Sequence, residues 1–327
     1  MHNRRSARDD RRLGGMKTGL CSLACKNCTI RHPQLRAGRL WLAACGLQLV
    51  ACACGLLLVA ILPRMPSGMQ LSSDVTSSLP ALAIGFRPEF LDFRRGIRVG
   101  NLEDNERITR ILKLALEGRY GEPFVTERWG RGVHWRWIGY LARANRAAKP
   151  LSSHVSFGCS KFFLMMDTEE ALFKCGMQVE RGYLKAPRDA RECQLRSDWD
   201  WHRLRAALKP NTAAERALRR LVLREGFRLH AGSWEADSAD YHRTNFPPLP
   251  KIRRLLAAAP GNHWAGFQVY YPMTQAEVRA STGLDLIESM LAVFAEVAPL
   301  MNLCMQTALR VNTSNKPQAA SNKPQAF

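Results

Sequence analysis

The chain has 327 residues, of which 46% are hydrophobic, so it is neither too short nor too polar to bury a core. Its 48 Lys and Arg residues outnumber 28 Asp and Glu residues, and the net charge of +20 bears on partners and solubility rather than on the fold. Six of the ten cysteines precede residue 55. The other four lie far apart in apolar surroundings, which favours reduced core residues over a disulfide framework: Cys159, Cys175, Cys193 and Cys304.

Residues 1–39 form a basic leader, with ten Lys or Arg residues against two acidic ones. The stretch CSLACKNC, from Cys21 to Cys28, has the C-x3-C-x2-C spacing that holds a four-iron cluster in radical enzymes. Asn27 stands where those enzymes usually have an aromatic residue, and no run of β/α units follows. A zinc site that uses these cysteines and His32 lacks a fourth ligand. We therefore predict a disordered leader with no metal and no cofactor.

Residues 40–62 form an uncharged hydrophobic segment in which Gln48 is the single polar side chain. A helix of that length rises about 34 Å, enough to cross the hydrocarbon core of a bilayer. The basic leader before it predicts that the N-terminus lies inside and the rest of the chain outside. We therefore predict a transmembrane helix and a single-pass membrane protein.

Other interpretations of this front end remain open. The segment could be a cleaved signal, or a lipoprotein signal ending at Cys52, although ten apolar residues follow that cysteine. Alternatively, translation starts at Met65 or Met69, which would remove the segment and leave a cytoplasmic protein.

The remaining chain divides by composition. Residues 63–83 are rich in Ser, Pro and Gly and are predicted to be a linker. Residues 311–327 repeat SNKPQA and are predicted to be a disordered tail. Residues 84–310 are left as one folded domain.

In this domain, some segments have apolar residues at helical spacing and others alternate apolar and polar residues. A first helix is expected between Asn101, which can cap it, and Gly118. Strands are then expected where apolar and polar residues alternate, at 133–137, 155–160, 173–180, 227–230 and 265–271, with the second and third forming a hairpin. Further helices are expected at 197–208, 213–224 and 284–309, and Thr274 with Glu277 has the spacing of a capping box.

Strands separated by helices and joined through a tight hairpin indicate an α+β fold. We predict a mainly antiparallel sheet of about five strands packed on helices, preceded by the N-terminal hydrophobic helix. Trp135 and Trp137 are expected to face the core together with Val133.

The face of this sheet opposite the core is the candidate site. It would carry His134, Arg136, His154, Lys174, Gln178 and Glu180. Arg136 and Lys174, with His134 and Gln178, could bind an anion, and His154 with Glu180 could transfer a proton. The simpler interpretation is that antiparallel sheets commonly expose one polar face to water.

Residues 119–149 interleave seven cations with aromatic residues, a mixture that can bind single-stranded nucleic acid. Tryptophans that face the core and solvated arginines are the favoured explanation of this stretch, so nucleic acid is possible but not favoured. For a body outside a membrane, anionic lipid headgroups are the better target. No GxxxxGK[ST], GxSxG or HExxH motif occurs in the sequence. Asp198 and His202 would share one helix face, where capping by acidic residues is the commoner role.

From the sequence we expect a membrane-tethered α+β domain that binds an anionic ligand, either a small molecule or lipid headgroups, and that is non-catalytic. The alternative is a soluble intracellular enzyme or nucleic-acid-associated protein translated from Met65 or Met69.

Overall fold

The computed structural model describes residues 83–147, 158–188, 192 and 195–312. These residues all belong to the second of two units into which the chain divides, residues 61–327. The predicted leader, hydrophobic segment, tail and most of the linker lie outside the described residues, as does His154. Among the helices that the structure describes, none combines the length and the hydropathy of a membrane span.

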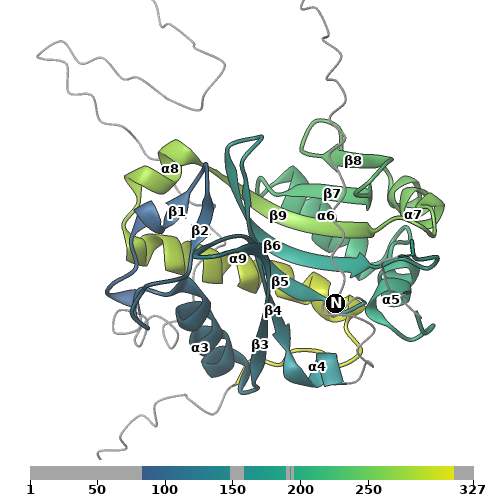
Figure 1. Ribbon diagram of the computed structural model, residues 1–327. Helices are drawn as coiled ribbons and strands as arrows, with labels where there is room; N and C mark the ends of the chain where they lie inside the picture. Colours follow the sequence, from purple (N-terminus) through teal and green to yellow (C-terminus); the bar gives the residue numbers. More distant parts are fainter. Residues whose placement is uncertain (1–82, 148–157, 189–191, 193–194, 313–327) are drawn as a thin grey trace, which may run out of the picture. The chain divides into compact units, whose positions relative to one another are not determined.

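A single sheet of nine strands runs through the domain (Figure 1). Its strands are β1 (Leu91–Asp92), β2 (Gly96–Arg98), β3 (Phe124–Arg131), β4 (His134–Ala142), β5 (Lys161–Asp167), β6 (Leu172–Arg181), β7 (Arg228–Ser233), β8 (Ser238–Tyr241) and β9 (Ala265–Thr274). Their order is β1-β2-β4-β5-β6-β9-β7-β8, and β3 pairs with β4 outside this path. Neighbouring strands are antiparallel.

Seven α-helices lie within the described residues, together with the short 3-10 helix η1 (Pro88–Phe90). They are α3 (Ile108–Tyr120), α4 (Arg143–Ala147), α5 (Asp200–Ala207), α6 (Ala213–Leu223), α7 (Leu249–Ala258), α8 (Gln275–Ala280) and α9 (Gly283–Cys304). The α+β fold with a mainly antiparallel sheet is therefore confirmed, although the sheet has nine strands instead of the expected five.

Local sequence signals explain several helix ends. Thr274 and Glu277 form the predicted capping box at the start of α8, and Thr282 with Asp285 forms a second one at the start of α9. Gly121, with a φ of 64°, ends α3 in the left-handed conformation that glycine adopts without strain. The prediction that α3 ends at Gly118 was wrong by one turn.

The predicted hairpin is present, but its first strand was placed too early. Strand β5 covers residues 161–167, whereas the alternation suggested 155–160. Residues 155–157 lie outside the described residues, and residues 158–160 precede the strand. Ser160 donates its backbone N–H to the buried carboxylate of Asp200, which ties it to α5, whereas Gly158 donates its backbone N–H to the backbone oxygen of Glu180 in β6 at 2.9 Å.

The two-residue alternation of β6 separates the two faces of the sheet. Phe173, Cys175, Met177 and Val179 all belong to the main core, as predicted. We call the side that they occupy the first face. Buried residues of α3, α5, α6, α7 and α9 belong to the same core, so these helices cover the first face.

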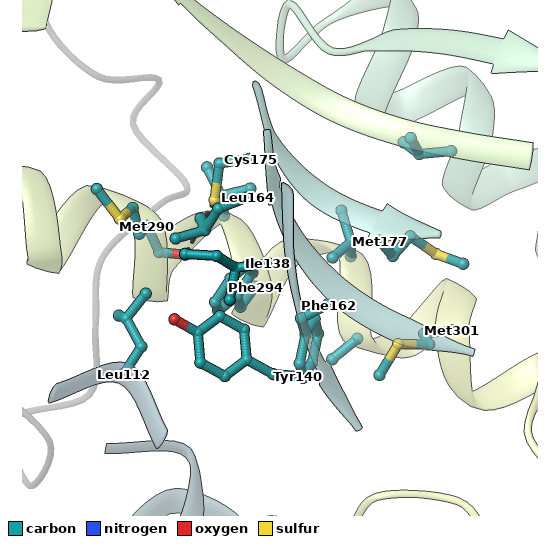
Figure 2. Close-up of a cluster of buried hydrophobic side chains, with 14 of the residues drawn as sticks. Leu112, Ile138, Tyr140, Phe162, Leu164, Cys175, Met177, Met290, Phe294 and Met301 are labelled. Atoms are coloured by element: carbon teal, nitrogen blue, oxygen red, sulfur yellow. Dashed lines mark hydrogen bonds between the residues drawn. The ribbon is translucent and has the colours of Figure 1, made fainter. Parts of the chain in front are cut away.

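Helix α9 supplies the centre of this core (Figure 2). The ring of Phe294 stacks on Phe162 of β5 with the ring centroids 4.7 Å apart. The thiol of Cys175 donates to the backbone oxygen of Met290, one turn earlier on the helix, at 3.8 Å. The long apolar helix therefore packs directly on the central strands.

A β-bulge in β4 changes the predicted orientation of its tryptophans. Trp129 of β3 lies opposite Trp137, but Gly130 lies opposite Trp135, so Arg136 is an extra residue in β4. An extra residue reverses the alternation. Trp135 consequently packs against the main core, whereas Trp137 joins a separate cluster with Phe163 and Tyr270. The expectation that both tryptophans face the core was wrong.

Candidate functional site

The face of the sheet opposite the helices, which we call the second face, carries a polar row. Directly opposed residues in an antiparallel pair share a face, so the register places five polar side chains side by side. They are Lys161 (β5), Gln178 (β6), Gln268 (β9), His230 (β7) and Asp240 (β8). The predicted polar face therefore exists, and Lys161, His230, Asp240 and Gln268 are members that we did not single out.

Glu180 lies inside this face and is engaged on both carboxylate oxygens. One oxygen accepts from Lys161 Nζ, and the other accepts from Gln178 Nε2 at 2.7 Å. Lys161 Nζ also donates to Glu127 of β3 at 3.1 Å. Burial alone would lower the pKa of Lys161, but the charges of Glu180 and Glu127 outweigh it and raise that pKa above its ordinary value.

The amide of Gln178 continues the network sideways. Its oxygen accepts from the indole N–H of Trp137 at 3.1 Å and from the Gln268 amide at 2.8 Å. Glu180 and Gln178 are only 2% and 1% exposed. A buried carboxylate that already accepts two hydrogen bonds is a structural acceptor rather than an accessible base. His154, its predicted partner in proton transfer, lies outside the described residues.

Lys174 is also engaged. Its ammonium contacts Asp167 at 2.8 Å and Glu170 at 3.1 Å, and it lies 5.0 Å from the ring centroid of Tyr270. Burial tends to lower the pKa of Lys174, but the hydrogen bond to Asp167 helps to raise it above its ordinary value. Two carboxylates already neutralise this cation, so it is a poor donor for a further anion.

The structure thus divides the predicted site in two. Gln178, Glu180 and Lys174 lie on β6 in the middle of the sheet. His134 and Arg136 lie at the beginning of β4, in the hairpin that β4 forms with β3. The expectation of one continuous site was wrong, because the order of the strands places β5 between β4 and β6.

The β3–β4 hairpin carries several exposed cations and one exposed aromatic side chain. Trp129 is 64% exposed, and Arg128, Arg131 and Arg136 are exposed as well. Trp129 lies opposite Trp137 on the second face, whereas Arg128 lies opposite Ile138 of the main core and so projects from the first face. His134 lies directly opposite Arg131 on one side and Arg98 of β2 on the other, which makes a row of three basic residues across three strands. We call these residues the basic hairpin patch: Arg98, Arg128, Trp129, Arg131, His134 and Arg136.

Aromatic rings, rather than acidic groups, hold two of these arginines. The guanidinium of Arg128 lies 4.4 Å from the ring centroid of Trp135, and that of Arg98 lies 5.6 Å from Phe90. Within the part of the chain that the structure describes, none of the patch arginines forms an ion pair. No acidic side chain of the described residues therefore neutralises their charges.

Asp92 is an acidic residue that lies near His134, but it is engaged locally. The backbone N–H groups of Arg94 and Arg95 donate to its carboxylate at 2.8 and 3.0 Å. Burial tends to raise the pKa of Asp92, yet these two hydrogen bonds help to bring it below the ordinary value. This carboxylate stays ionised while it caps the β1–β2 turn, and it leaves the patch arginines unneutralised.

The described side chains do not support a metal site, and they do not bring Asp198 and His202 together. Among them, no group of three or more His, Cys, Asp or Glu residues could hold a metal ion. Cys159, Cys175 and Cys304 are buried, in agreement with the prediction of core residues, whereas Cys193 lies outside the described residues. Asp198 and His202 do not meet, because Asp198 lies in the loop before α5 and accepts from Gln306 at 2.8 Å.

Comparison of the chain with protein-family models, with curated proteins and with solved structures finds no match.

Lys161 and strand β3 are among the parts of the site that sequence reasoning missed. Lys161 opens the apolar run KFFLMM, and a charge that begins such a run is a usable signal of a buried ion pair. Strand β3 was not predicted, because its residues FVTERWGR alternate poorly and five of the eight are exposed. Only its pairing with β4 makes it a strand.

Proposed function

We propose that this chain is a non-catalytic binding protein for an anionic ligand, which the basic hairpin patch contacts. The observation that carries the proposal is the exposure, in one hairpin, of Trp129 and of arginines that no described acidic side chain neutralises. Guanidinium groups bind carboxylate and phosphate through two parallel hydrogen bonds, and an exposed indole adds contact area beside them. From the predicted site, the proposal retains Arg136 and His134.

Lys174 and Gln178 are left out of the ligand contact. Both are engaged by neighbouring side chains on the second face, and binding an anion there would first require those interactions to break. Lys174 and Gln178 instead stabilise the sheet to which the β3–β4 hairpin belongs. Glu180, enclosed with Lys161, is likewise assigned to the structure rather than to catalysis.

Retention on a heparin column tests this proposal. We expect a variant with Ala at Arg128, Arg131 and Arg136 to elute at lower salt than the wild type. The matched control replaces three exposed arginines elsewhere with Ala: Arg253, Arg254 and Arg279. Both variants lose three positive charges, so elution of the two at the same salt concentration would refute the patch and leave only the overall charge of the protein.

We further propose that residues 40–62 tether the domain to a membrane, where the patch could meet an anionic small molecule or lipid headgroups. Mass spectrometry of the native N-terminus tests the tether. A mature chain that begins at Met65 or Met69 lacks residues 40–62. That result would favour the alternative of a soluble intracellular enzyme or nucleic-acid-associated protein.

A further inference from the structure

The patch lies on an edge of the sheet. Among the described residues, β3 pairs with β4 and with no other strand. An edge strand leaves alternate backbone N–H and C=O groups without a partner, and it can accept another strand.

Two hydrogen bonds fix the direction of the backbone groups of β3. Arg143 N–H donates to the oxygen of Pro123 at 2.8 Å, so the ladder passes through residue 123. Phe124 N–H instead donates to the side chain of Glu117 at 2.9 Å. In an antiparallel ladder, residues alternate between facing the partner strand and facing away. The backbone groups of Thr126 and Arg128 therefore point away from β4, and both residues are exposed.

The positive charge of β3 determines which kind of strand could pair with its open edge. Arg128, Arg131 and Trp129 project from the same strand whose backbone is open. A second copy of this chain would bring a like-charged strand against it, and like charges directly opposed destabilise a strand pair. The chain's own C-terminal segment starts nearby, since Asn312 N–H donates to the oxygen of Arg119 at 2.8 Å. Residues 313–327 contain two lysines and no acidic residue, so they do not complement the edge either.

We infer that β3 binds an acidic peptide in extended conformation as an added strand, with Thr126 and Arg128 supplying backbone hydrogen bonds and the side chains of Arg128 and Arg131 pairing with its carboxylates. This inference rests on the proposed function and names the ligand class of the same patch. A nucleic acid or lipid headgroup would use the arginines and Trp129 but would not need the open backbone.

The test separates the backbone from the charges. Thr126→Pro removes an outward N–H, costs no hydrogen bond to β4, and places the proline ring where an added strand would lie. Thr126→Ala is the matched control. The probe is a labelled peptide of ten alternating Glu and Val residues, and binding to the full chain is followed by fluorescence anisotropy. We expect Thr126→Pro to weaken binding about tenfold relative to Thr126→Ala, with heparin elution unchanged.

Equal affinity of the two variants for the peptide would overturn strand addition while leaving the anion-binding patch intact. Wild-type binding to a twelve-residue oligo-dT or to phosphatidylserine vesicles, without binding to the peptide, would overturn the ligand class. A peptide with N-methylated backbone amides gives a second test that needs no protein variant. We expect it to bind about tenfold more weakly than the unmodified peptide, and equal binding would refute the inference. Loss of the patch itself would appear in the heparin comparison of the three-arginine variants.

Discussion

Lys161 is completely buried, and its replacement by methionine is the most direct test of how the second face is held together. Methionine keeps the length and most of the volume of the lysine side chain but removes the charge. In the variant, Glu180 would keep its hydrogen bond from Gln178 and would lose its contact with the ammonium. Glu127 would lose its 3.1 Å contact with the same ammonium.

The size of the effect follows from burial. Removing one partner of a buried ion pair costs about 3–5 kcal/mol, because the remaining charge lies in a medium that cannot solvate it. For a domain of this size, each kcal/mol lowers the melting temperature by about 2–4 °C. We therefore expect Lys161→Met to melt about 6–20 °C below the wild type.

Thermal unfolding followed by tryptophan fluorescence measures this shift. Lys113→Met is the matched control, because Lys113 pairs with Glu117 on the surface of α3 at 3.8 Å and such pairs contribute at most about 1 kcal/mol. A Lys161→Met variant that melts within about 2 °C of this control would refute the reasoning, because a loss that small means that water or the remaining groups already compensate the carboxylates.

Three further predictions concern the core and the far end of the polar row. Phe294→Ala should destabilise the protein by about 3–5 kcal/mol in urea denaturation, because it empties the stack on Phe162, and a loss below about 1 kcal/mol would contradict this packing. Cys175 should react with iodoacetamide only as fast as the protein unfolds, because burial raises the pKa of its thiol, and fast labelling of the native protein would show an open core. The hydrogen bond from His230 holds the pKa of Asp240 below its ordinary value, so the pair stabilises the fold above the unfolded pKa of Asp240, and this contribution is lost as the pH falls through the folded pKa. Asp240→Asn should therefore flatten the stability profile between pH 7 and pH 3 in urea titrations, and an unchanged profile would contradict the pair.

Particular elements show why prediction succeeded or failed. The alternation in β6 and the Thr274 capping box were predictable because each depends on residues close together in the chain. The position of β5 could not be read reliably, because residues 155–160 and 161–167 both offer apolar side chains. The pairing with β6 and the contact of Ser160 with Asp200 decide between them.

The candidate site was predicted as one surface because alternation alone assigns each side chain to a face and says nothing about position along the sheet. Gln178 and Glu180 were correctly placed on the second face, but their burial depends on Lys161, Trp137 and Gln268 from other strands. Arg136 was predicted as a surface cation and is one, although the bulge that it creates was not visible in the sequence.

The sequence by itself determined the fold class, the apolar side of β6 and the basic character of residues 128–136, since side-chain chemistry and local periodicity specify these properties without distant partners. The tertiary structure decided which charges remain open. Lys161 meets Glu180 and Glu127 from 19 and 34 residues away in the chain. The patch arginines meet no such partner among the described residues. A charge is neutralised only by what folding brings within a few ångströms, and that depends on strand order and register.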